Sequence, residues 1–292
     1  MAPATERTPA WSLAVVAMFS VQLGSAVSVQ LFDDLGVAGT AWLRFTFGAL
    51  IFIAIARPRY WRWSWTELRP PALLGVVSAC MSLSFLSAIS LIPLGTAVAI
   101  QFLGPLTVAA IYTRNTGSLA WPAVALVGVL ALTEPWSGTV NLAGVAFAAV
   151  GGVGWALYIV ITQHVGDRFS GVDGLAISLP VAALVTLAVG LPQALGHVDT
   201  YVIIVALVAA ILLPVIPWTL ELYALRRLTK AAFGTLQALE PAIALVIGMF
   251  VLSQTPHLSQ VLGVACVVAA GAAAQKAGRR GEDPPMFRTP VE

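Results

Sequence analysis

The sequence predicts an all-α integral membrane protein with ten transmembrane helices, arranged as two inverted five-helix repeats. Three observations support this fold class: the composition, ten long apolar runs, and basic residues confined to alternate loops. Hydrophobic residues make up 59% of the 292 residues, charged residues only 10%, and the mean hydropathy is +0.91. Soluble proteins average about 45–50% apolar and about 25% charged residues. This composition excludes a cytosolic enzyme, a nucleic-acid-binding protein and a disordered chain.

Ten apolar runs supply the predicted spans. A helix needs about 20 apolar residues to cross the hydrocarbon core. The runs lie at residues 11–31, 37–56, 71–90, 94–113, 119–134, 141–163, 172–193, 201–221, 230–251 and 257–275. Turn-forming residues separate them, as at Gly166-Asp167 and Thr255-Pro256. The first run is expected to stay as a span rather than act as a cleaved signal peptide, because only Arg7 precedes it and Glu6 offsets that charge.

Basic residues lie in every second loop, and 14 of the 15 lysines and arginines follow this pattern. They are Arg7, Arg57, Arg59, Arg62, Arg69, Arg114, Arg168, Arg226, Arg227, Lys230, Lys276, Arg279, Arg280 and Arg288. The opposite loops contain acidic residues such as Asp33 and Asp199 instead. Because cytoplasmic loops are enriched in basic residues, both termini are predicted to be cytoplasmic. Tyr60 and three tryptophans in the loop 57–70 indicate an interfacial aromatic belt rather than nucleic-acid binding.

An internal repeat appears when the chain is shifted by about 135 residues. Residues 39–50 then fall on 173–184, and Ile100–Pro105 fall on Leu236–Pro241. We therefore predict a cytoplasmic tail at 1–10, a first repeat at 11–134, a second repeat at 141–275 and a cytoplasmic tail at 276–292. Five spans per repeat place the two halves in opposite orientations. Inverted repeats are typical of secondary transporters that alternate access to a site near the membrane midplane.

Glycines and prolines inside the spans indicate how the helices pack. Four glycines of the sixth run (Gly144, Gly151, Gly152 and Gly154) are typical of close helix packing. Pro105 and Pro241 occupy equivalent repeat positions, and proline removes a backbone donor from a helix. We interpret both as kinks that line one central cavity, although kinks that only shape the packing are the alternative.

Three charged residues lie within or at the edge of the spans, where a charge costs about 2.5–3.5 kcal/mol. Glu240 is near mid-depth and is the main candidate for proton coupling or for binding a substrate ammonium; a structural hydrogen bond is the alternative. Arg44 is a candidate to bind a substrate carboxylate or to neutralise Glu240. Glu221 is a further candidate, with an interfacial ion pair to Arg226 or Arg227 as its alternative.

Neutral polar and aromatic residues complete the candidate site. They are Gln22, Gln101, Gln237, Thr235, Trp155, Tyr158 and Tyr223. A pocket with a carboxylate, a guanidinium, amides and aromatic rings suits a small zwitterion, but an aromatic box can equally hold an organic cation. No metal site is predicted, because the chain has no HExxH and no paired-cysteine spacing. The same absence of motifs argues against a membrane-embedded enzyme or an assembly subunit.

Ten spans in two sets of five resemble the EamA-type drug/metabolite transporter superfamily of bacteria. Within it, the chain is similar to the threonine/homoserine exporter family over residues 11–275. The segments that carry the similarity are Ser20–Gly24, Trp42–Phe45, Ile92–Leu106, Gly154–Ile159 and Phe233–Ala242. The resemblance implies export of hydrophilic amino acids across a bacterial inner membrane, driven by the proton motive force without a cofactor, by a monomer or homodimer.

The resemblance also bears on individual residues. Arg44, Glu240, Gln22, Trp155 and Tyr158 fall on polar positions of the family. An acidic residue often stands in the family where this chain has Gln101, and another stands near Gln254. The first departure is expected to affect the substrate or the coupling. The second hypothesis is an exporter of organic cations or drugs with the same fold.

Overall fold

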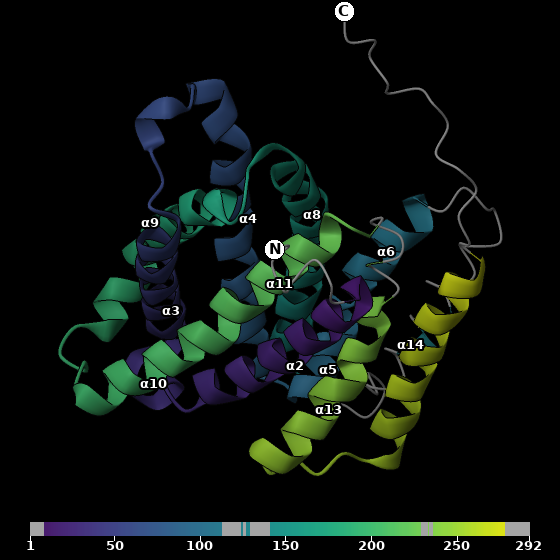
Figure 1. Cartoon of the computed structure of the whole chain (residues 1–292). Coiled ribbons are helices and arrows are strands. Elements are labelled where there is room, and N and C mark those ends of the chain that lie inside the picture. Colours follow the sequence, from purple (N-terminus) through teal and green to yellow (C-terminus); the bar gives the residue numbers. More distant parts are fainter. Residues whose placement is uncertain are drawn as a thin grey trace, which may run out of the picture.

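The computed structural model describes residues 9–112, 124, 127–128, 141–228, 233 and 236–277, and the regular elements of this part are all helical (Figure 1). The helices are α2 (Ala10–Val29), α3 (Phe32–Ala56), η1 (Tyr60–Arg62), α4 (Trp65–Ile89), α5 (Leu94–Gln101), α6 (Leu103–Tyr112), α8 (Leu142–Arg168), α9 (Asp173–Ala194), α10 (Thr200–Ala210), η4 (Ile211–Val215), α11 (Ile216–Leu225), η5 (Gln237–Leu239), α13 (Glu240–Val251) and α14 (Leu258–Ala277).

Six helical segments among the described residues are long and apolar enough to span a membrane, and three shorter apolar helices accompany them. The chain is thus a multi-pass membrane protein. The structure confirms helices at nine of the predicted spans. The predicted span at 119–134 lies almost entirely outside the described residues, so the predicted count of ten stays untested.

The loop predicted at 57–70 is shorter in the structure, because α4 already begins at Trp65. A capping box at Ser64 and Glu67 explains this start: each side chain hydrogen-bonds the backbone N–H of the other residue. The loop is also fixed to α9, since the Tyr60 hydroxyl donates to the Ala176 carbonyl at 3.1 Å. Partial burial raises the pKa of the Tyr60 hydroxyl, so this group stays protonated and can donate.

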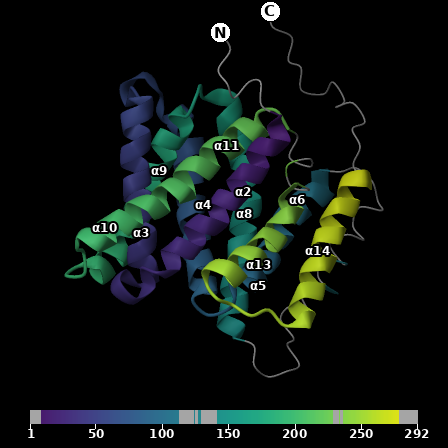
Figure 2. The same cartoon turned by 60° about the horizontal axis from the view of Figure 1, so that its bottom comes forward.

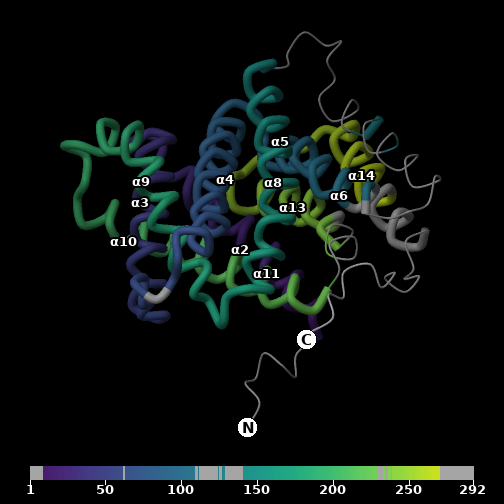
Figure 3. The backbone as a smooth tube through the Cα atoms, turned by 90° about the horizontal axis from the view of Figure 1, so that it is seen from above, coloured from purple at the N-terminus to yellow at the C-terminus, as the bar shows by residue number. Residues whose placement is uncertain are grey.

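The helices pack in antiparallel and crossed pairs around a common centre (Figures 2 and 3). Helix α3 lies along α9, α4 lies along α8, α2 lies along α10 and α11, and α5 contacts α13. Glycines permit the closest approaches. A Cβ on Gly104 would clash with the Gly152 carbonyl, and one on Gly75 would clash with the Ser178 carbonyl. Small residues let backbones approach in this way in membrane helices.

The predicted eighth span is a broken helix. Helix α10 leads into η4, a π-helical segment in which Leu213 has non-helical angles (φ −159°, ψ 109°), and α11 follows. Pro214 comes next and has no backbone donor. Side chains of other helices bind the carbonyls at this break: Ser20 donates to Leu212 at 2.7 Å and Arg44 donates to Leu213 at 3.2 Å. Such partners are what makes a break tolerable inside a membrane.

The predicted fourth and ninth spans are also interrupted. Helix α5 ends at Gln101 and α6 begins at Leu103, while the 3₁₀ turn η5 comes directly before α13. Pro105 and Pro241 lie in the first turns of α6 and α13, just after these interruptions. Backbone N–H groups of a first turn have no intrahelical acceptor, so proline is tolerated there.

Candidate functional site

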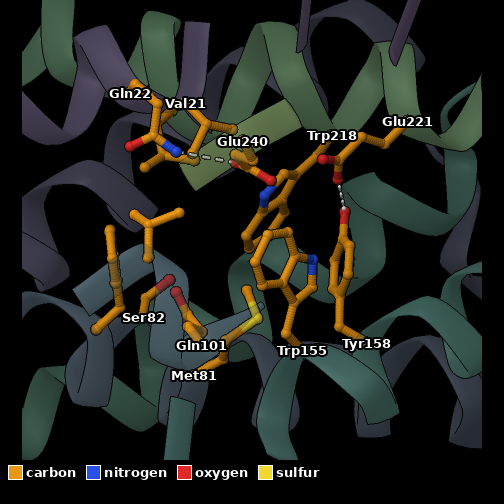
Figure 4. Close-up of a pocket in the computed structure, with 13 residues that line it drawn as sticks. Val21, Gln22, Met81, Ser82, Gln101, Trp155, Tyr158, Trp218, Glu221 and Glu240 are labelled. Carbon is orange, nitrogen blue, oxygen red and sulfur yellow. Dashed lines mark hydrogen bonds between the residues drawn. The ribbon is translucent and has the colours of Figure 1, made fainter. Parts of the chain in front are cut away.

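A cavity lies where α2, α4, α5, α8, α11 and α13 meet, and it contains roughly 500 Å³ of space not filled by atoms (Figure 4). Six residues predicted for the site line it: Gln22, Gln101, Trp155, Tyr158, Glu221 and Glu240. The other lining residues were not predicted from the sequence; they are Val21, Met81, Ser82, Phe85, Val98, Leu213 and Trp218. Helices from both halves of the chain therefore build the site.

Glu240 is only 1% exposed and stands at the first residue of α13. Its Oε1 accepts a hydrogen bond from Gln22 Nε2 of α2 at 3.0 Å. Glu240 Oε2 and Gln22 Oε1 are buried and have no partner among the described residues. Buried acceptors without a donor are costly and uncommon. This pair therefore offers a place for a proton or for the donor groups of a ligand.

Glu221 is the second carboxyl of the cavity and is 4% exposed. The Tyr158 hydroxyl donates to Glu221 Oε2 at 2.9 Å, and the Tyr158 ring packs on Trp218 with centroids 5.4 Å apart. The alternative for Glu221 was an interfacial ion pair with Arg226 or Arg227, and the first of these arginines has other partners. Arg226 donates to the Gly166 carbonyl near the end of α8 and to the Phe169 and Gly171 carbonyls of the α8–α9 connection.

Gln101 and Ser82 supply neutral polar groups to the cavity and are 5% and 6% exposed. Gln101 stands at the last residue of α5, next to the break before α6. Its amide lies against α8, where a Cβ on Gly151 would come within 2.7 Å of Gln101 Nε2. The glycine at position 151 thus makes room for the Gln101 side chain.

Arg44 lies outside the cavity lining and is 1% exposed. Its Nε donates to the Leu213 carbonyl and its Nη1 donates to Ser28 Oγ at 3.0 Å. These contacts place the guanidinium at the break between α10 and α11. They support a structural role at this break, whereas the structural role predicted for Arg44 was to neutralise Glu240.

The remaining predicted residues do not line the cavity. Gln237 is fully buried, and its amide has no hydrogen-bond partner within the described part of the chain. The Tyr223 ring lies 5.4 Å from Arg226 Cζ. Thr235 is outside the described residues. Pro241 directly follows the lining residue Glu240, but neither Pro105 nor Pro241 contributes a side chain to the cavity.

A signal for one of the missed residues was present in the repeat. Three pairs of lining residues differ by the same 136 positions: Gln22 and Tyr158, Ser82 and Trp218, Phe85 and Glu221. Gln101 and Gln237 follow the same offset. Each residue predicted for the site has a repeat equivalent 136 positions away, and that equivalent was also a candidate. This rule would have found Phe85 from Glu221. It would not have found Met81 or Val98.

The chain is similar to known membrane transporters. Residues 142–273 match the model of the EamA-like transporter family. The chain is 36% identical over 273 residues to the threonine/homoserine exporter RhtA of Escherichia coli (strain K12), covering 90% of this chain and 91% of that protein. It is 34% identical over 277 residues to the threonine/homoserine exporter RhtA of Salmonella typhimurium (strain SL1344), covering 92% and 93%.

A solved structure described only as the crystal structure of a protein superposes with a TM-score of 0.63 at 19% identity. The match covers 92% of this chain and 99% of that one. At this identity the match shows a shared fold.

Proposed function

Because this chain belongs to the EamA-like transporter family of the drug/metabolite transporter superfamily, we propose that it is a secondary active exporter of small polar metabolites, with amino acids such as threonine and homoserine as substrates. The observation that carries the proposal is the similarity to named threonine/homoserine exporters over nine-tenths of the chain. The cavity, lined by two carboxyls, amides and aromatic rings, is consistent with such a substrate.

The proposed mechanism is alternating access between two inverted repeats of five spans each. The packing supports it. In the proposed repeat α2 corresponds to α8 and α4 corresponds to α11, so the repeat relates the contact between α4 and α8 to the contact between α2 and α11. It also relates α3 to α9 and α5 to α13, and the two helices of each pair are in contact. The constant offset of 136 positions within three pairs of lining residues supports it as well. Two similar halves that close the path on either side at similar energy would alternate access to one site.

The proposed orientation places both termini in the cytoplasm of a bacterial cell, with the protein in the inner membrane. The distribution of basic residues supports it. Single cysteines in a variant without Cys80 and Cys266 test the orientation. Arg59→Cys is expected to react with an impermeant maleimide only in inverted vesicles, and Asp199→Cys only in intact cells. The opposite pattern contradicts the orientation.

Glu240 is the proposed carrier of the coupling proton. Its unpartnered Oε2 faces a space where a proton or a substrate ammonium satisfies it. Ionised carboxylates at both Glu240 and Glu221 would put two like charges in one poorly hydrated cavity, so at least one is neutralised by a proton or a cation. Competition between the proton and the substrate for Glu240 couples the two gradients.

Transport into inverted vesicles tests this coupling. An imposed proton gradient is expected to drive threonine uptake by the wild-type protein. Glu240→Gln is expected to abolish gradient-driven uptake, because an amide cannot exchange a proton. Asp34→Asn is the matched control, since it makes the same change at an exposed position at the start of α3. If Glu240→Gln keeps gradient-driven transport, the coupling role of Glu240 is wrong.

A second candidate function is export of organic cations. Two carboxyls beside Trp155, Trp218 and Tyr158 are a suitable environment for a cation. Cells that overproduce the protein distinguish the two functions. Protection against toxic amino-acid analogues supports amino-acid export, and protection against cationic dyes supports cation export.

A further inference from the structure

The polar groups of the cavity are not evenly distributed between the two halves of the chain. Both carboxyls, Glu221 and Glu240, come from α11 and α13 of the second half. The described polar residues of the first half are neutral: Gln22 from α2, Ser82 from α4 and Gln101 from α5. Repeat equivalence sharpens the contrast, because the equivalents of Glu221 and Glu240 at the offset of 136 positions are an apolar Phe85 and Gly104.

Gln101 and Ser82 are available to a ligand. Both side chains are more than nine-tenths buried and line the cavity. Neither side chain makes a hydrogen bond to another described residue. Figure 4 shows both pointing into the cavity on the side away from the Gln22–Glu240 hydrogen bond and from the Glu221–Tyr158 hydrogen bond. The Ser82 hydroxyl and the Gln101 amide, whose Nε2 lies beside Gly151 of α8, therefore have no described partner that a ligand would need to displace.

From this arrangement we infer that the cavity orients an amino acid, with its ammonium at Glu240 and its carboxylate at Gln101 and Ser82. The inference rests on the proposed function and names the specificity-determining residues of the same site. The Glu240 end presents the unpartnered acceptors that an ammonium needs. A carboxylate at that end would face like charge, whereas Gln101 and Ser82 offer it neutral donors. Arg44 takes no part, because its donors serve the broken helix.

Gly151 has a positioning role in this arrangement. A methyl group there would meet the amide of Gln101, which is the far end of a flexible side chain, at 2.7 Å. Gly151→Ala therefore displaces Gln101 without requiring the backbone to move. This variant disturbs the carboxylate end while both hydrogen-bonding groups of that end remain in the protein.

Ligand binding to the purified full-length protein tests the inference without relying on transport. Thermal stabilisation is titrated with three compounds: L-threonine, L-threoninamide, which lacks the carboxylate, and N-acetyl-L-threonine, which lacks the ammonium. The wild-type protein is expected to bind threonine more tightly than either analogue. Gln101→Ala is expected to raise the Kd for threonine about tenfold or more, the effect of losing a hydrogen bond to a charged group, and to leave the Kd for threoninamide within about twofold of the wild-type value.

Two further variants make the test sharper. Gln101→Glu is expected to reverse the preference, so that threoninamide binds more tightly than threonine, because the new carboxylate repels one and attracts the other. Gly151→Ala is expected to raise the Kd for threonine by a larger factor than the Kd for threoninamide. Gln30→Glu, which makes the same substitution at an exposed residue after α2, is the control and is expected to change neither Kd.

The outcomes separate this inference from the proposed function. If the Gln101 variants raise the Kd for threonine and for threoninamide by the same factor, the proposed orientation is wrong, but the cavity still binds an amino acid. If the wild-type protein binds threoninamide as tightly as threonine, the carboxylate end does not exist. If none of the three compounds stabilises the wild-type protein, both the orientation and the proposed substrate class fail.

Discussion

The hydrogen bond between Tyr158 and Glu221 allows a quantitative test of the cavity. The substitution Tyr158→Phe removes only the hydroxyl, which lies 2.9 Å from Glu221 Oε2. The ring remains, so its packing on Trp218 at 5.4 Å between centroids is expected to persist. The change in the free energy of unfolding therefore reports on the hydrogen bond rather than on lost packing.

The size of the effect follows from burial. Tyr158 is 1% exposed and Glu221 is 4% exposed, so water replaces the lost donor poorly. A buried acceptor left without its donor costs about 1–3 kcal/mol, and a hydrogen bond to an ionised group is worth about 1.5–3 kcal/mol. We expect Tyr158→Phe to lower the free energy of unfolding by about 1–3 kcal/mol. A value in the upper half of this range indicates an ionised Glu221.

A double-mutant cycle measures the interaction directly. The wild-type protein, Tyr158→Phe, Glu221→Ala and the double variant are unfolded in mixed micelles, and far-UV circular dichroism follows the loss of helix. The expected interaction free energy is about 1 kcal/mol or more. Tyr223→Phe on α11 is the matched control, since the structure shows its ring, not its hydroxyl, in contact with Arg226. If the effects of Tyr158→Phe and Glu221→Ala on the free energy of unfolding add within about 0.3–0.5 kcal/mol, the contact is refuted.

Three further predictions concern the scaffold, each measured as the free energy of unfolding in the same micelles. Gly104→Ala is expected to cost about 1–3 kcal/mol, because its Cβ meets the rigid carbonyl of Gly152; an unchanged stability would mean that α6 and α8 do not cross so closely. Ser64→Ala is expected to cost about 1 kcal/mol by removing the N-cap of α4, and a threonine there should restore most of it. Gln254→Ala is expected to cost about 1 kcal/mol, since its Oε1 accepts from the Leu94 amide at 3.2 Å; no loss of stability would argue against this contact between α5 and the end of α13.

The predictions made from the sequence succeeded where hydropathy alone decides the outcome. Apolar runs of about 20 residues can only be satisfied as helices in a bilayer, and the structure has helices at nine of the ten predicted positions. The interruptions within spans were harder to place. Pro105 and Pro241 drew attention to the right segments, but the interruptions come before them, and the deepest break is at Leu213.

The candidate site was predicted in part for a similar reason. Glu240, Glu221 and Gln101 were recognised because polar groups in a membrane are costly and need a partner or a function. The same rule also selected Arg44, whose partner is the carbonyl exposed by the break at Leu213. Trp218 was missed because an aromatic residue in an apolar run gives no sign of the direction it faces.

The sequence by itself determined that this chain lies in a membrane, where its helices fall, which loops carry basic charge, and which polar residues must be accounted for. Only the tertiary structure decided which side of each helix faces the cavity, which break Arg44 serves, and that Glu221 and Glu240 line the same cavity as Gln22, Ser82 and Gln101. The physical reason is that lipid and protein interior are equally apolar, so the helices here are apolar on all sides. Their sequences lack the amphipathic pattern that in a soluble protein reveals the buried face.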